Sequence, residues 1–131
     1  MSDQLPNPSV VLFVVDVQGV ARFYETVAAM KVMVAENDHV VLAVAGLELV
    51  VHRLRGEPDP RGSIDAGVAV REDAYLKLCL PVRSVAEART MAAALGGSIK
   101  DTRHEWSARG FRACDGHDPE GNVIQVREPA G

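Results

Sequence analysis

The chain of 131 residues is 47% hydrophobic, which is enough apolar material for the core of one domain. Charged residues make up 24% of it and the net charge is -4, so no basic surface is available to gather the phosphates of a nucleic acid. The apolar run at residues 10–15 is too short to cross a bilayer and follows no cationic leader. We therefore expect a cytoplasmic protein with neither nucleic-acid nor membrane partners.

The first half of the chain predicts one strand, one helix and three further strands. Residues 10–15 form a β-branched apolar run, and Asp16 follows as a residue suited to capping a helix. Apolar side chains then recur at steps of three and four residues, which gives a helix with one buried face: Val20, Phe23, Tyr24, Val27 and Met30. Three β-rich runs separated by turn-forming residues complete this half: 31–36, 39–45 and 47–54.

The middle of the chain predicts a linker. Residues 55–73 are rich in Gly, Pro, Asp and Arg, a composition that neither a helix nor a central strand tolerates. Within this segment, residues 66–70 favour a short edge strand. The linker ends at about residue 75, before the next apolar run.

The second half repeats the pattern of the first. A strand at residues 76–82 precedes Ser84, which stands at the capping position of a helix that ends at Gly96 and Gly97. The buried face of this helix comprises Val85, Ala88, Met91, Ala92 and Leu95. Three strand candidates follow, at residues 98–105, 110–114 and 122–127.

An internal repeat accounts for this doubled order. Aligning Asp16 with Ser84 shifts the chain by 68 residues and brings apolar positions into register without a gap. The matched pairs are Val10 with Leu78, Val20 with Ala88, Phe23 with Met91 and Val27 with Leu95. We predict one α+β domain over residues 1–131, with βαβββ modules at about residues 9–54 and 76–128 and a linker at about 55–75.

One segment is specific enough to indicate a family. Residues 118–122 read Asp-Pro-Glu-Gly-Asn, a tight turn that launches the following strand at a fixed angle. This segment resembles the signature before the last strand of the glyoxalase, bleomycin-resistance and extradiol-dioxygenase superfamily, the vicinal oxygen chelate fold. Asp16 after its strand and the Phe23-Tyr24 pair on the next helix resemble a second hallmark. The resemblance covers about residues 9–128 and implies a curled, cleft-bearing mixed sheet and a homodimer.

The resemblance also implies where a metal would bind. Ligands in this superfamily are His or Glu on the first and last strands of each half, and by motif position these become Ser9, His52, Lys77 and Gln125, with His52 matched to Gln125. Residues 8–15 and 122–126 contain no His, Asp, Glu or Cys. Lys77 adds an ammonium that would repel a divalent ion by several kcal/mol at about 5 Å and a dielectric constant of about 20. We therefore expect a cleft without a metal cofactor.

The same positions are candidates for binding a small molecule. Lys77 would anchor an anion if it faces the cleft rather than solvent, and Gln125 would donate and accept hydrogen bonds. Ser9 would lie at the start of the first strand of the same cleft. Glu48 alternates onto the face of His52, so these two residues are a candidate proton-transfer pair.

Several further side chains have both a functional and a structural interpretation. Trp106 either lines the cleft or covers the edge of a sheet. His104, two residues earlier on the same predicted strand, would share its face and bind a ligand or be solvated. His117 is predicted to be exposed or locally capping in a turn. Cys79 and Cys114 are predicted to be reduced thiols in the core.

The combined prediction is a bleomycin-resistance-like protein whose cleft binds a small polar or aromatic molecule without metal. One alternative is a metal-dependent lyase, isomerase or dioxygenase of the same superfamily with displaced ligands. Another is a structural or interaction domain whose cleft is closed by apolar side chains. The sequence assigns no catalytic residue.

Overall fold

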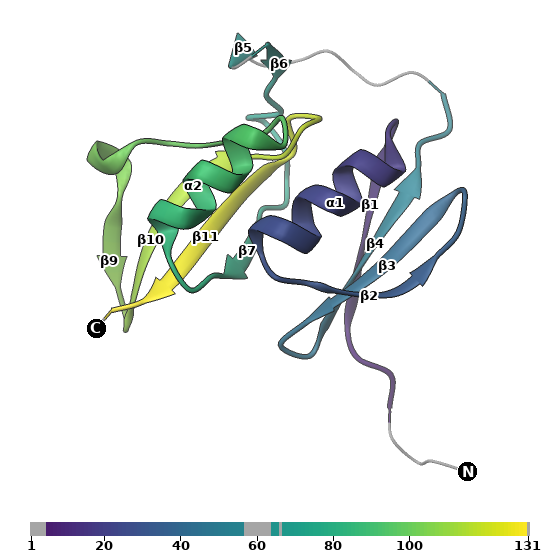
Figure 1. Cartoon of the computed structure of the whole chain (residues 1–131), viewed down its shortest axis with the longest axis horizontal. Helices are drawn as coiled ribbons and strands as arrows, with labels where there is room; N and C mark the ends of the chain where they lie inside the picture. Colours follow the sequence, from purple (N-terminus) through teal and green to yellow (C-terminus); the bar gives the residue numbers. More distant parts are fainter. Residues whose placement is uncertain (1–4, 57–63, 66, 131) are drawn as a thin grey trace.

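The N-terminal half forms one four-stranded sheet and one helix in a computed structural model that describes residues 5–56, 64–65 and 67–130 (Figure 1). Its elements are β1 (Ser9–Val14), α1 (Val17–Val27), β2 (Lys31–Ala35), β3 (His39–Val44) and β4 (Leu47–Arg53). The strand order of this sheet, called sheet 1, is β1-β4-β3-β2. β1 is parallel to β4, and the other pairs are antiparallel.

The C-terminal half builds a second sheet with the same plan. Its elements are β7 (Leu78–Pro81), α2 (Val85–Ala94), β8 (Ser98–Ile99), the 3-10 helix η1 (Thr102–His104), β9 (Trp106–Ala108), β10 (Phe111–His117) and β11 (Val123–Pro129). The order of this sheet, called sheet 2, is β7-β11-β10-β8, with β9 added on β10. β7 is parallel to β11, as β1 is to β4. The predicted doubling of the βαβββ unit is confirmed.

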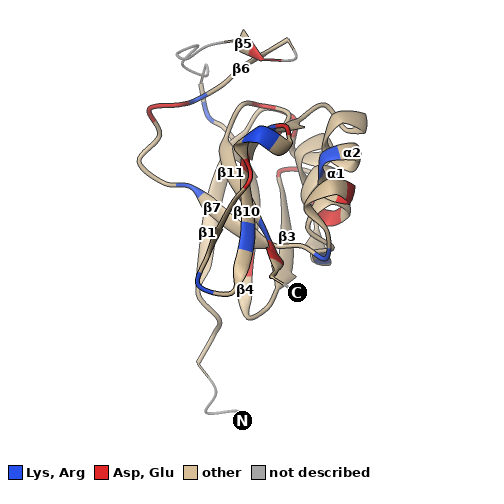
Figure 2. Ribbon diagram, turned by 90° about the vertical axis from the view of Figure 1, so that its left-hand side faces the viewer, with Lys and Arg blue, Asp and Glu red and all other residues tan. Residues whose placement is uncertain are grey.

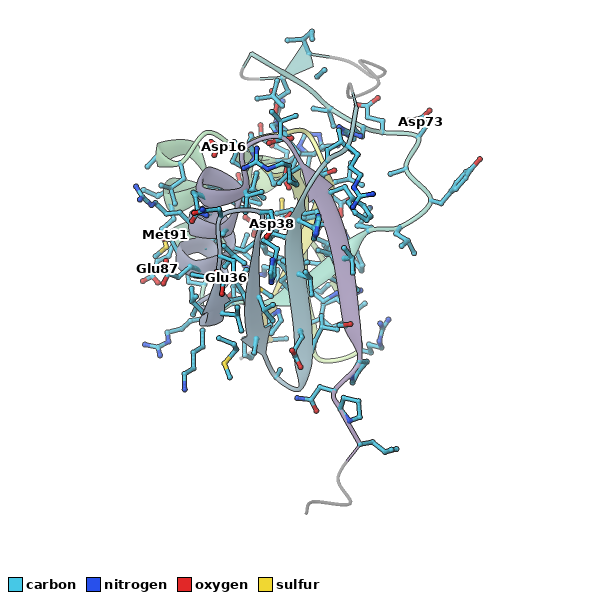
Figure 3. All side chains as sticks on the ribbon, turned by 90° about the vertical axis from the view of Figure 1, so that its right-hand side faces the viewer. Asp16, Glu36, Asp38, Asp73, Glu87 and Met91 are labelled. Carbon is cyan, nitrogen blue, oxygen red and sulfur yellow. The ribbon has the colours of Figure 1, made fainter. Side chains whose placement is uncertain are left out.

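Both helices lie on the same side of the two sheets. The two side views show α1 and α2 together on one side of the strands, to the right in Figure 2 and to the left in Figure 3. α1 packs on β3 and β4, and α2 packs on β8, β10 and β11, while the two helices contact each other. Burial on the helix side joins both halves in one core, whose largest fully buried side chains are Tyr24, Phe23, Leu42, Leu49, Leu80 and Ile124.

Both predicted helix caps are present. The Asp16 carboxylate accepts a hydrogen bond from the backbone N–H of Gly19 at 3.0 Å, and the Ser84 hydroxyl accepts one from that of Glu87 at 3.1 Å. Gly96, with φ of 90°, follows α2 in the left-handed conformation that the sequence predicted there. None of the helices in the described part of the chain is long and apolar enough to span a membrane.

The segment at residues 98–105 is not the single strand that was predicted. β8 ends at Ile99, and the Asp101 side chain accepts a hydrogen bond from the backbone N–H of Arg103 at 3.2 Å, which starts a 3-10 turn. His104 belongs to this turn and Trp106 to β9. The prediction that His104 and Trp106 share one strand face is therefore wrong, because a local Asx-type hydrogen bond interrupts the strand.

The linker carries a small hairpin of its own. β5 (Ile64–Asp65) pairs with β6 (Val68–Ala69), so the predicted edge strand at 66–70 is shorter and joins neither main sheet. Residues 57–63 and 66, also part of the predicted linker, lie outside the described residues. Arg71 donates its backbone N–H to the carbonyl of Gly121 at 2.8 Å, which ties the linker to the turn before β11. A Cβ at Gly121 would collide with the carbonyl oxygen of Ala69.

The Asp-Pro-Glu-Gly-Asn segment at residues 118–122, called the signature turn, holds the two modules together. The fully buried Asp118 carboxylate accepts hydrogen bonds from the backbone N–H groups of Glu120 (2.8 Å) and Asn122 (3.0 Å). It also accepts from the Asn122 amide and, across the module junction, from the Tyr24 hydroxyl, both at 2.8 Å. The Glu120 carboxylate accepts from the backbone N–H groups of Val15 (2.8 Å) and Asp16 (2.6 Å) at the start of α1.

We expect Asp118→Ala to lower the free energy of unfolding by about 3 kcal/mol, because it leaves the buried Tyr24 hydroxyl and two backbone donors without acceptors. Tyr24→Phe removes one of these bonds and should cost about 1 kcal/mol. Urea unfolding measures both. Asp38→Ala, at an exposed carboxylate, is the matched control and should change stability by less than about 0.5 kcal/mol. Equal losses for Asp118→Ala and Asp38→Ala would contradict this account.

The burial of Asp118 also predicts a pH dependence. Burial raises the pKa of this carboxyl above its unfolded value, so the folded protein keeps the proton to higher pH than the unfolded chain does. The folded state is therefore favoured in acid and loses stability as pH rises from about 4 through the folded-state pKa. The free energy of unfolding of the wild type should fall relative to that of Asp118→Asn over this range, measured by urea unfolding at several pH values. A constant difference would show that Asp118 does not titrate in this way.

Candidate functional site

The side of each sheet that faces away from the helices, called its outer face, carries most of the predicted site residues, whereas His104 lies in the 3-10 turn η1. On sheet 1 the register places Ser9 beside Glu48, Val11 beside Val50 and Phe13 beside His52. Glu48 and His52 are four residues apart on one strand, so about 13 Å separates their Cα atoms and Val50 lies between them. This spacing is too long for direct proton transfer between Glu48 and His52.

Sheet 1 presents a mostly apolar outer face with an aromatic end. The ring of His52 lies 5.8 Å from that of Phe13 in an edge arrangement and 5.9 Å from that of His39, stacked. The Nδ1 atom of His52 lies 2.9 Å from the carbonyl oxygen of Arg53. Large apolar side chains on β1 and β2 and at the end of β1 remain exposed: Val11, Phe13, Val15, Met33 and Val34.

Sheet 2 presents a chain of polar contacts on its outer face, called the polar ladder. The Lys77 ammonium lies 3.3 Å from the Asp115 carboxylate. The same carboxylate accepts a hydrogen bond from the Gln125 amide nitrogen at 2.9 Å, and the Gln125 oxygen accepts one from Nε of Arg127 at 2.7 Å. The structure thus brings Lys77 and Gln125 together through Asp115, a residue that the sequence analysis did not select.

The ladder ends in a group of aromatic and arginine side chains, called the arginine–aromatic cluster. Cζ of Arg127 lies 4.4 Å from the centroid of the Phe111 ring, and Cζ of Arg109 lies 5.0 Å from it. Trp106, on the added strand β9, packs edge-on against Phe111 with 5.9 Å between centroids. Trp106 is 42% exposed, so it covers the edge of sheet 2 while keeping part of its ring accessible.

A cavity of about 720 Å³ lies between the end of the linker and sheet 2. Lys77, Asp115 and His104 line it, whereas Ser9, Glu48, His52, Trp106 and Gln125 do not. The His104 ring is held by the Asp101 carboxylate, 2.8 Å from its Nδ1 atom. Of the predicted site residues, Lys77 and His104 therefore border a common space.

His117 differs from its prediction. It ends β10 and is only 3% exposed, so the prediction of an exposed turn residue is wrong. Its Nε2 atom lies 2.9 Å from the Asp65 carboxylate and its Nδ1 atom 2.8 Å from the carbonyl of Asp118. β10 runs three residues beyond its predicted end and draws His117 under the β5–β6 hairpin.

The two cysteines have different surroundings, and both are free thiols. Cys114 lies in the core as predicted, and burial raises the pKa of its thiol, which favours the neutral form. Cys79 is half-buried outside the core cluster and pairs in register with Gln125 of sheet 2. The prediction of a core position for Cys79 is wrong, because β7 turns its odd-numbered residues to the outer face.

Strand register corrects the matching of the two modules. Val10 pairs with Leu49 in the first module, and the equivalent Leu78 pairs with Ile124 in the second. His52 therefore corresponds to Arg127, and Gln125 corresponds to Val50. The predicted match of His52 with Gln125, which already allowed a small gap beyond the 68-residue shift, is wrong by two residues, because the register of the last strands requires a larger gap.

The residues at the superfamily's ligand positions do not suit a divalent metal. They offer a hydroxyl, an imidazole, an amide and the cations of Lys77 and Arg127, whereas catalytic metal sites use about three His, Cys or carboxylate ligands. Within residues 5–56, 64–65 and 67–130, no three or more His, Cys, Asp or Glu side chains gather closely enough to hold an ion.

Comparisons with known proteins give a family from a sequence model and a fold from solved structures. A family model described as a glyoxalase-like domain matches residues 9–127. A glyoxalase/bleomycin resistance protein from Albidiferax ferrireducens has a TM-score of 0.66 at 16% identity, covering 92% of this chain and 96% of that one. A fosfomycin resistance protein from Listeria monocytogenes has a TM-score of 0.60 at 16% identity, covering 99% and 96%.

A third solved structure is similar over nearly the whole of both chains. It is an integron cassette protein from V. cholerae, with a TM-score of 0.60 at 21% identity, covering 98% of each chain. At these identities the solved structures establish the fold alone. No curated protein sequence matches this chain.

Proposed function

This chain belongs to the glyoxalase-like domain family, and we propose that it binds a small polar or aromatic molecule on the outer face of sheet 2 without a divalent metal. The observation that carries the proposal is that both ends of the Gln125 amide are hydrogen-bonded within the ladder. Its amide nitrogen donates to Asp115 and its oxygen accepts from Arg127, so this side chain is already oriented within the ladder. Gln125 occupies the last-strand position at which the superfamily resemblance implies a metal ligand.

Electrostatics support the same proposal. An ion bound to the Gln125 oxygen would lie within about 5 Å of the Arg127 guanidinium, which donates to that oxygen at 2.7 Å. At an effective dielectric constant of about 20, a divalent ion and a single cation at that distance repel each other by roughly 7 kcal/mol. Asp115 offsets part of this repulsion but is itself engaged by Lys77.

The surface offers what an organic ligand needs. At its Arg127 end the ladder reaches Phe111, against which the partly exposed indole of Trp106 packs. At its other end Lys77 and Asp115 border a cavity large enough for a small molecule. We therefore expect a ligand that has hydrogen-bonding groups, which the ladder would bind, and an aromatic ring, which would stack on Trp106.

The competing proposal is a metal-dependent enzyme of the same superfamily with displaced ligands. A solved mutant of the Listeria monocytogenes fosfomycin resistance protein contains Mn(II) and a dihydroxypropylphosphonic acid, so that protein binds a metal on a similar fold. In this chain the stacked imidazoles of His39 and His52 on sheet 1 are the donors that could contribute to such a site.

Metal retention separates the two proposals. After incubation with Ni(II), Zn(II), Mn(II) or Fe(II) and desalting, we expect much less than one ion per chain and no large rise in Tm. A bound metal at 100 times its Kd would add about 2.7 kcal/mol of stability, which is several degrees for a domain of this size. Stoichiometric retention that is lost in His39→Ala and His52→Ala would instead establish the enzyme proposal.

We also propose that a second copy of the chain covers the outer face of sheet 1, giving a homodimer. Phe13 is 52% exposed, and it lies with four other exposed apolar side chains on β1 and β2 and at the end of β1. An apolar face of this kind marks an interaction surface.

We also propose a reducing, cytoplasmic location, which the free thiols of Cys79 and Cys114 support.

Phe13→Asp should convert the dimer to a monomer, because it places a charge within the apolar contact. Light scattering coupled to size exclusion gives the mass directly. Tyr75→Asp, at a fully exposed aromatic on the linker, is the matched control and should leave the mass unchanged. A wild-type protein that is monomeric at high micromolar concentration would contradict the dimer.

A further inference from the structure

We propose that Arg109 and Arg127 bind the anionic group of the ligand and that the ligand is a planar aromatic carboxylate. This inference rests on the proposed function and identifies the chemical class that the outer face of sheet 2 accepts. It assigns the anchoring charge to two arginines rather than to Lys77, the anchor that the sequence suggested.

Two features together distinguish these two cations: both lie over the ring of Phe111, and neither has a carboxylate partner among the described residues. Lys77 is paired with Asp115 at 3.3 Å, Arg89 with Glu105 at 2.6 Å, and Arg103 with Asp101 at 3.0 Å. In the described part of the chain, no carboxylate lies within 4.0 Å of the guanidinium of Arg109 or Arg127. The hydrogen-bond partner of Arg127 is the neutral amide of Gln125. Among the described residues, the two positive charges of the arginine–aromatic cluster therefore have no carboxylate partner.

The geometry leaves both guanidinium groups able to bind an anion. Cζ of Arg109 lies 5.0 Å and Cζ of Arg127 lies 4.4 Å from the centroid of the Phe111 ring, so the ring supports both guanidinium groups through cation–π contacts. The N–H donors project from the edge of the guanidinium plane, which is the part that binds a carboxylate in a two-pronged manner. N–H donors of the two arginines can therefore bind one carboxylate, while Phe111 already supports both guanidinium groups.

The polar ladder orients one of the two arginines before any ligand arrives. Asp115 accepts from the nitrogen end of the Gln125 amide, which turns the oxygen end toward Nε of Arg127. Gln125 is only 5% exposed, so this orientation is protected from water. Holding Arg127 in place reduces the side-chain entropy that would otherwise be lost on binding.

Trp106 supplies the reason for an aromatic ligand. Its indole packs edge-on against Phe111, the ring over which both guanidinium groups lie, and Trp106 is 42% exposed. A planar ring stacked on the indole would bring an attached carboxylate to the arginine edges. Simple inorganic anions would gain the charge contact but not the stacking.

The test uses Trp106 itself, because it is the one tryptophan in the chain. 4-Nitrobenzoate, a planar aromatic carboxylate and a quencher of indole fluorescence, is titrated into the full-length protein in parallel with the neutral 4-nitrobenzamide. Free N-acetyltryptophanamide corrects for collisional quenching. We expect saturable quenching by the carboxylate and binding at least tenfold weaker for the amide, with the difference shrinking as salt is added.

Three variants complete the test. Arg109→Gln, at an exposed turn residue, and Arg127→Gln should each weaken 4-nitrobenzoate binding at least fivefold, whereas Arg22→Gln, the matched control at an exposed position on α1, should change it less than twofold. Equal affinity for the carboxylate and the amide, an equal loss with Arg22→Gln, or no saturable quenching would overturn the inference. Equal affinity would leave metal-free binding of small molecules intact, so the two proposals fail separately. Binding that requires added Mn(II) would overturn the proposed function instead.

Discussion

The burial of one carboxylate, Asp118, is the constraint on which the remaining architecture depends. A charged or polar group at 0% exposure is tolerable only when each of its oxygens is hydrogen-bonded, and four donors meet that need. Three of the donors shape the signature turn, and the fourth, the Tyr24 hydroxyl, comes from the other module. The cost of leaving this group unpaired therefore fixes the turn and the docking of α1 together.

The two sheets repeat one topology but have different chemistry on their outer faces. Sheet 1 exposes valines, a methionine and Phe13, while sheet 2 exposes the polar ladder and the arginine–aromatic cluster. The core sides of both sheets are mainly apolar where they pack on the helices. The repeat thus preserves the packing surface and leaves the outer faces free to differ, one suited to association and the other to recognition.

Sequence patterns predicted the elements whose signals are local. The cap residues Asp16 and Ser84, the helical spacing of the core positions and the turn at residues 118–122 all specify structure within a few residues. They were sufficient for the doubled unit and the family. Asp101 shows the limit of the same method, since one side-chain hydrogen bond divided a segment whose composition favours a strand.

The site was less predictable because it depends on register between distant strands. Asp115 lies opposite Gln125 only after β10 and β11 have paired, and Phe111 meets Arg127 for the same reason. Neither contact leaves a pattern in the sequence. Lys77 and Gln125 were recognised by their family positions, but their partners, and so the location of the unbalanced charge, required the pairing of the strands.

The backbone hydrogen bond between Arg71 and Gly121 connects the linker that lines the cavity to the signature turn. The linker that covers the cavity is bonded to the same five-residue turn that fastens the first module to the second. A ligand that displaced the linker or packed against it would therefore change the stability of the contact between the two modules. Ligand occupancy of the cavity and the association of the two modules become thermodynamically linked, so a change in the stability of the module junction can report ligand binding.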